Sequence, residues 1–130
     1  MLESIAVLLV ALLFGGMVLY SFGFAAFVFK TLPADLAGPT IRKAFPHFYL
    51  FVMATALAAT PVLWTVNVTD AVLMAAIVLT TLPTRQLLMP AINRATDAGQ
   101  KTRFKWLHTL SVLITLAHMV MAAIVLISLT

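Results

Sequence analysis

Every lysine and arginine of this chain lies in one of two short stretches, and long uncharged segments flank both of them. A concentration of basic residues in short connecting loops is typical of the cytoplasmic side of a membrane protein. The pattern therefore restricts the chain to folds that cross a bilayer and place both basic stretches on one side. The first stretch holds Lys30, Arg42 and Lys43, and the second holds Arg85, Arg94, Lys101, Arg103 and Lys105.

The composition indicates that lipid is the main solvent of the chain. Hydrophobic residues make up 63% of it and charged residues 9%, and the mean hydropathy is +1.11. Soluble domains are about half apolar and about a quarter charged. The net charge of +4 could suggest a nucleic-acid partner, but beside such apolar segments we expect the basic residues to contact anionic lipid headgroups and no nucleic acid. The absence of cysteine excludes disulfides and thiolate metal sites.

Four uncharged apolar segments predict an all-α bundle of four transmembrane helices. A helix needs about 20 apolar residues to cross the bilayer. The third segment reaches that length only if Arg85 belongs to its last turn and extends its charge toward the headgroups. The predicted helices cover residues 4–29, 46–67, 70–89 and 105–129 of a single transmembrane domain, 1–130.

The charge bias also predicts how the chain is threaded through the membrane. An even number of spans places both termini on one side, and the basic loops favour the cytoplasm. We therefore expect both termini to be extracytoplasmic, in the inner membrane of a bacterium. Residues 1–29 lack a basic start and a small-residue cleavage site, so they are predicted to be a span rather than a signal peptide.

The connection between the first two predicted helices has a pattern of its own. Pro33 and Asp35 suit the start of a helix, and apolar residues alternate with polar ones as far as Phe45. This pattern predicts a short amphipathic segment along the membrane interface, and the alternative is a plain linker. The second basic loop is polar and predicts a turn near Gly99.

The predicted helix 105–129 carries a polar stripe. His108, Ser111, Thr115 and His118 fall within an arc of about 80° on a helical projection. Ionisable residues inside a membrane are costly and usually face the bundle interior or a cavity. The stripe therefore predicts a polar seam for a small solute, a proton or a metal. The alternatives are hydroxyls bonded to their own helix backbone and a single interhelical hydrogen bond from His118.

Two histidines offer a further hypothesis. His47 and His108 both stand near the cytoplasmic ends of their predicted helices, so they should lie at comparable depth. Histidines at matched depth on different helices can ligate haem b or a metal. The alternative is that both form interfacial hydrogen bonds. Beyond that hypothesis the sequence predicts no cofactor.

Small residues mark a face of the first predicted helix. Gly15, Gly16 and Gly23 stand where helices could approach closely in lipid. The face predicts either packing within the monomer or a contact between copies in a homo-oligomer. Pro61 and Pro83 lie inside the second and third helices and predict kinks.

Several classes of function lack support in this sequence. It holds no phosphate-binding glycine loop and no hydrolase or metalloprotease motif, so an enzyme is the less favoured reading. All carboxylates stand at predicted helix ends or in loops, so we expect no buried acid. They are Glu3, Asp35, Asp70 and Asp97.

Short motifs across most of the chain resemble one family of small membrane proteins. In chain order they are Gly23-Phe24 with Phe27, Leu32-Pro33, Gly38, Phe45-Pro46-His47-Phe48-Tyr49, Leu88-Met89-Pro90, and Phe104-Lys105-Trp106-Leu107-His108 with Ser111. Together they are similar to the transmembrane protein 205-like family, whose bacterial members carry domain of unknown function 4149. The resemblance implies a four-helix membrane bundle and directs attention to Pro33, Pro46, Tyr49, Pro90, His108 and Ser111.

The resemblance and the polar stripe lead to one functional prediction. Eukaryotic members of that family are associated with tolerance of metal-based drugs, which implies an export role, although the lack of cysteine here argues against transfer between sulfur ligands. We predict a small non-enzymatic membrane protein that supports transport or efflux of a small solute or metal species as a homo-oligomer. The alternatives are a haem- or quinone-linked redox protein using His47 and His108, and a structural or assembly subunit of a larger complex.

Overall fold

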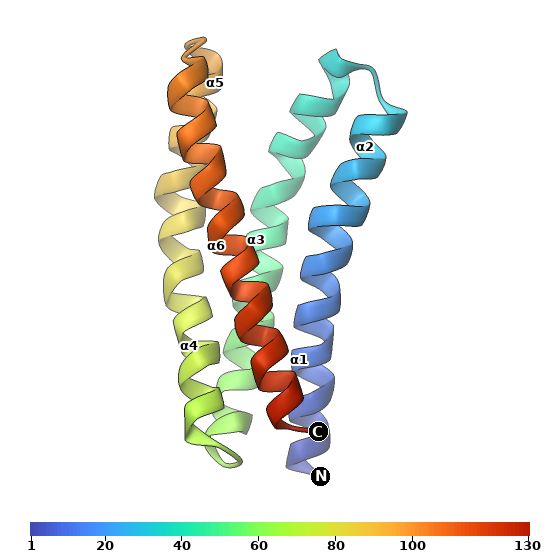
Figure 1. Cartoon of the computed structure of the whole chain (residues 1–130), viewed down its shortest axis with the longest axis vertical. Helices are drawn as coiled ribbons and strands as arrows, with labels where there is room; N and C mark the ends of the chain where they lie inside the picture. The colour runs from blue at the N-terminus through green and yellow to red at the C-terminus, as the bar shows by residue number, and fades with distance from the viewer.

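The computed structural model describes all 130 residues, and the chain forms four long helices without any strand (Figure 1). Each helix is long and apolar enough to cross a membrane, which confirms the predicted all-α bundle. Of the 110 backbone hydrogen bonds, 95 lie within helices, as hydrocarbon requires because it offers the backbone no water. The four helices cover Leu2–Thr31, Ala34–Trp64, Val68–Asp97 and Lys101–Ser128.

Two of these helices contain a π-helical segment. The first consists of α1 (Leu2–Val18), the π-helical η1 (Leu19–Phe24) and α2 (Ala25–Thr31), and the third consists of α4 (Val68–Pro83), the π-helical η2 (Thr84–Leu88) and α5 (Met89–Asp97). The second and fourth are α3 (Ala34–Trp64) and α6 (Lys101–Ser128). The segment η2 starts directly after Pro83, where the missing N–H and the ring disrupt the regular α-helical bonds. Such wide turns are rare and are frequent at functional sites.

The helices form a four-membered ring in which each packs on two others. The helix α3 packs on α1 and α4, and α6 packs on the same two, so α3 and α6 lie diagonally opposite. Both chain termini and the turn at 65–67 lie at one end, which is the lower end in Figure 1 and is called the termini end below. The lysines and arginines lie toward the opposite end, called the basic end.

The core is apolar and tightly packed. Its fully buried side chains include Met17 of α1, Phe48 and Leu63 of α3, and Met74 of α4. Large apolar side chains also cover the outer surface, and Leu79 is 70% exposed. Exposed leucines over a whole helical surface suit contact with lipid chains rather than water.

The structure differs from the sequence prediction between the first two helices. Residues 34–45, expected as a short interfacial segment separate from the span, are the first turns of the continuous helix α3. Pro39 and Pro46 do not end this helix. Each proline removes a single backbone donor, and near the exposed start of a helix water can bond the carbonyl that is left free.

Side-chain contacts tie the basic end together. The hydroxyl of Tyr20 donates to the Ala44 carbonyl oxygen at 2.8 Å, which links η1 to α3. The Nε of Arg85 donates to the Pro46 carbonyl oxygen at 3.2 Å, which links η2 to α3. The guanidinium of Arg85, which is predicted to extend toward the headgroups, thus also has a protein partner in α3.

A further contact joins the two helix pairs at the basic end, where α2 packs on α3 and α5 packs on α6. The guanidinium of Arg42 donates two hydrogen bonds to the Asp97 carboxylate, at 2.7 and 3.0 Å. Both side chains are well exposed, so solvent screens the pair and it contributes little to stability. At the same end, Gly99 has φ of +67° between α5 and α6, which places the predicted turn there.

The structure separates the three glycines of the predicted small-residue face. A side chain at Gly16 would place its Cβ 2.5 Å from the Phe51 ring, so Gly16 allows α1 and α3 to approach within the monomer. Gly15 is exposed with open space around it, and Gly23 is exposed with only Leu19 of its own helix near. Gly15 and Gly23 therefore remain free for an external contact.

Gly16 therefore supports a prediction about stability. We expect Gly16→Val to lower the free energy of unfolding by about 1–3 kcal/mol, because the added carbons overpack against Phe51. The matched variant Gly15→Val meets open space and should change it far less. Unfolding of the purified protein by SDS in mixed micelles measures both, and equal losses would contradict the assigned α1–α3 contact.

Candidate functional site

The structure brings three members of the predicted polar stripe to the bundle interior. Ser111 is 7% exposed, His118 is 6% exposed, and Thr115 between them is half-buried. His108 is exposed at the basic end, where its ring stacks on Phe104 with centroids 5.4 Å apart. The stripe therefore faces inward over its deeper part only.

His118 bonds across to the neighbouring helix. Its Nε2 lies 2.7 Å from the Thr80 hydroxyl oxygen of α4, which also lies 2.7 Å from the Ala76 carbonyl oxygen. A threonine hydroxyl carries one hydrogen. If that hydrogen goes to the Ala76 carbonyl, Nε2 must be protonated and donate to Thr80. This contact is the interhelical hydrogen bond that the sequence left as the alternative role for His118.

Other polar side chains gather around this contact. The Tyr49 hydroxyl of α3 lies close to the Thr115 side chain across the diagonal of the ring. Thr81, which follows Thr80, is fully buried, and its hydroxyl has no hydrogen-bond partner. We call Tyr49, Thr80, Thr81, Thr115 and His118 the interior polar layer, with exposed Thr80 at its outer edge. It draws on three helices and contains the fully buried Thr81 hydroxyl without a partner and the imidazole of His118.

Ser111 stands outside this layer. Its hydroxyl donates to the His108 carbonyl oxygen of the preceding turn at 2.7 Å. That bond satisfies Ser111 within its own helix, as the alternative reading of the stripe expects. Ser111 therefore adds a buried hydroxyl to the seam but no link to another helix.

A second polar contact joins α4 and α6 near the termini end. The Ser128 hydroxyl donates to Asp70 Oδ2 at 2.9 Å, and Asp70 is only 3% exposed. The expectation that no acid is buried was therefore wrong. The sequence shows Asp70 in the first turn after the N-cap Asn67, but its burial depends on the end of α6 packing over that turn.

An apolar zone separates the two contacts between α4 and α6. From Asp70 to Thr80, and from Ser128 to His118, the distance along each helix is about 15 Å. The side chains between them are fully buried and apolar, so the interior of one copy has no open path. They are Met74, Ile77, Ala122 and Val125.

The two histidines considered as haem or metal ligands are placed apart from this interior. His47 lies on α3 and His108 on α6, which are diagonal rather than neighbouring helices, and both side chains are exposed. The structure therefore does not bring them into one enclosed site. It also holds no group of three or more His, Asp or Glu side chains arranged to bind a metal ion.

Comparison with known protein families identifies the family of this chain. The family model described as domain of unknown function DUF4149 matches residues 8–101, which is most of the chain. This protein belongs to the DUF4149 family. The match runs from α1 to the first residue of α6, so it includes Pro33, Pro46, Tyr49 and Pro90 but ends before His108 and Ser111. Comparison with curated proteins and with solved structures finds no match.

The contact between His118 and Thr80 supports a prediction about coupling. We expect a double-mutant cycle with Thr80→Val and His118→Leu to give a coupling energy between about 0.6 kcal/mol, the average for hydrogen bonds between membrane helices, and about 1.7 kcal/mol, the largest such value. SDS-induced unfolding of the wild type, both single variants and the double variant provides the cycle. Strictly additive losses would show that the two side chains act independently.

The unpartnered hydroxyl of Thr81 supports a prediction of the opposite sign. Thr81→Val should leave the free energy of unfolding unchanged or raise it by up to about 1–3 kcal/mol, because a buried donor without a partner is removed. The matched variant Thr84→Val should lower it, because the Thr84 hydroxyl donates to the Thr80 carbonyl oxygen at 2.8 Å. A clear loss in Thr81→Val would mean that a water molecule or ligand bonds this hydroxyl.

Proposed function

We propose that this DUF4149 protein is a non-enzymatic multi-pass membrane protein that supports the passage of a small polar solute or metal species. The observation that carries the proposal is His118, an ionisable side chain buried at mid-helix in a protein surrounded by lipid. Ionisable residues in such positions are costly and mark solute or proton paths by default. The neighbouring hydroxyls of Tyr49, Thr80, Thr81 and Thr115 supply further polar groups at the same depth.

The proposal includes an orientation in the membrane. All eight lysines and arginines lie toward one end of the bundle. We propose that this basic end faces the cytoplasm and its anionic headgroups, with both termini on the outer side of a bacterial inner membrane. In that orientation the exposed ring of His108 stands at the cytoplasmic mouth of the seam.

The proposal also includes assembly of two or more copies. The apolar zone between the Asp70 and His118 levels closes the interior of a single bundle. A path would therefore form between copies, along the outer edge of the α4–α6 contact where Thr80 is exposed. Gly15 and Gly23 leave an external face of the first helix on which a second helix can approach closely, but this helix lies diagonal to α4, so that contact would not itself line the edge.

Flux through proteoliposomes tests this function. The full-length protein is reconstituted, and release of protons, potassium ions and a set of small amines, carboxylates and metal salts is compared with empty vesicles. We expect at least one probe to move faster with the protein, and His118→Leu to reduce that flux by about tenfold or more. The matched control is Thr109→Leu, an exposed polar position on the same helix, which should retain the flux.

Two results would overturn the proposal. Equal flux of every probe through empty and protein-containing vesicles would remove transport and favour a structural or assembly role. Undiminished flux in folded His118→Leu protein would remove the interior polar layer from the path. Helical content by circular dichroism establishes that each variant is folded.

A further inference from the structure

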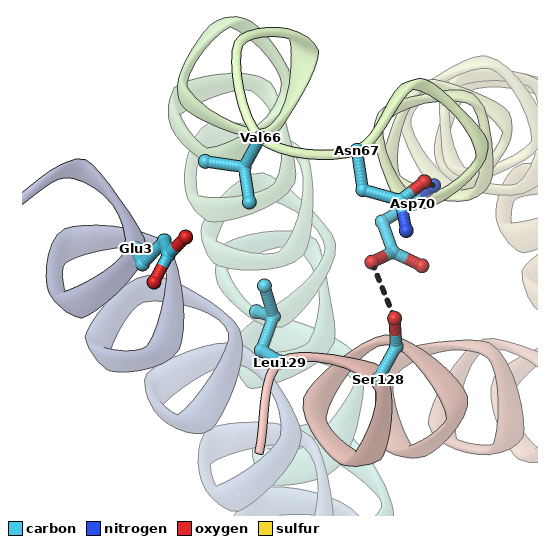
Figure 2. Close-up of a pocket in the computed structure, with 6 residues that line it drawn as sticks. All are labelled: Glu3, Val66, Asn67, Asp70, Ser128 and Leu129. Carbon is cyan, nitrogen blue, oxygen red and sulfur yellow. Dashed lines mark hydrogen bonds between the residues drawn. The ribbon is translucent and has the colours of Figure 1, made fainter.

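A pocket of about 240 Å³ opens at the termini end, between the turn that precedes α4, the end of α6 and the start of α1. Figure 2 shows the Asp70 carboxylate directed toward Ser128, with Asn67 beside it and Glu3 across the pocket. The lining is mainly polar, with two apolar side chains. Its residues are Glu3, Val66, Asn67, Asp70, Ser128 and Leu129.

Asp70 is the unusual group in this pocket. It is 97% buried, since only 3% of it is exposed, and its Oδ2 accepts the Ser128 hydroxyl. Its Oδ1 has no hydrogen bond from the protein and is not one of the fully buried polar atoms left without a partner, so it is accessible from the pocket. The N-terminus of α4 favours a negative charge at this position, so part of the cost of burying the carboxylate is offset.

No cation of the protein balances this charge. Arg42 with Asp97 at the basic end forms the ion pair of the structure, and neither Asp70 nor Glu3 pairs with a lysine, an arginine or the amino group of Met1. A largely buried carboxylate with no cationic partner is stabilised by an opposite charge that comes close to it. The pocket is therefore suited to a positively charged group that comes from outside the chain.

We propose that this pocket binds a small organic cation that carries N–H donors, such as a primary ammonium or a guanidinium group. The N–H groups would donate to Asp70 Oδ1 and to the Glu3 carboxylate, since charge-assisted hydrogen bonds are among the strongest. A short hydrocarbon part would lie against Val66 and Leu129.

The donor set and the volume favour an organic cation over a metal ion. The pocket contributes two carboxylates, and the structure has no group of three His, Asp or Glu side chains that could hold a metal. The volume of about 240 Å³ also far exceeds the roughly 10–15 Å³ that one water molecule needs in the same measure. A dehydrated metal ion would leave most of this pocket unfilled.

This inference goes beyond the proposed function and does not rest on it, because equilibrium binding at one end of the bundle requires no passage through the membrane. Binding without flux would support the pocket and overturn transport. Flux without binding would overturn the pocket and support transport. The two proposals are therefore tested separately.

The test is a titration of the full-length protein in nanodiscs with n-propylammonium chloride at constant ionic strength, followed by saturation-transfer NMR. We expect saturable binding in the millimolar range, and no binding of n-propanol, which has the same carbon chain without the charge. Asp70→Asn keeps the size of the side chain and its acceptor for Ser128, and it should weaken binding by about tenfold or more. Asp97→Asn removes a carboxylate at the opposite end and should bind like the wild type.

A second variant covers the case in which Asp70→Asn does not fold. Ser128→Ala leaves the carboxylate in place but removes its hydroxyl partner, so it should change the affinity by a few-fold. The proposal is overturned if n-propylammonium does not bind the wild type, if it binds folded Asp70→Asn equally well, or if Mg²⁺ or Ca²⁺ displaces it at lower concentration than any monovalent cation.

Discussion

The constraint on which this structure depends is that backbone N–H and C=O groups find no water inside a bilayer. Helices satisfy almost all of them internally, and the four helices here hold 95 of the 110 backbone hydrogen bonds. The regular α-helical geometry is interrupted at only a few places. After Pro83 the helix changes to the π-helical segment η2. The side chain of Arg85, within η2, donates to the Pro46 carbonyl oxygen of α3. Each π-helical segment thus carries a side chain that donates to a backbone carbonyl of α3.

Lipid removes the hydrophobic effect as a force between helices, so close packing and polar contacts hold them together. Close packing is seen at Gly16, which lets α1 approach the Phe51 ring of α3. Polar contacts join the helices at the basic end and also between α4 and α6, where the Asp70–Ser128 and Thr80–His118 contacts lie at two levels. The fully buried apolar side chains between the levels keep each contact separate. The same helix pair therefore contributes to both the interior polar layer at mid-depth and the acidic pocket at the termini end.

The candidate site was predictable in part. The period of 3.6 residues identified Ser111, Thr115 and His118 as one inward face, because a helix in a bundle turns one stripe toward its neighbours. That period could not show that the exposed ring of His108 stacks on Phe104 of its own helix. It could not name Thr80 as the partner of His118 either, since the pair lies on separate helices. Asp70 was misjudged for a related reason. A position at a helix end suggests exposure, and only the packing of α6 over that end buries it.

The sequence by itself determined the number of spans, the helical class and the concentration of positive charge at one end. These properties follow from hydropathy and charge along the chain, which each segment carries before it meets any other. The tertiary structure decided which helices are neighbours and which polar groups meet. It also decided that residues 34–45 are the first turns of α3. It also decided that His47 and His108 lie on diagonal helices while His118 and Thr80 touch. Burial and hydrogen bonding between helices depend on how several faces fit together, and no single segment specifies that fit.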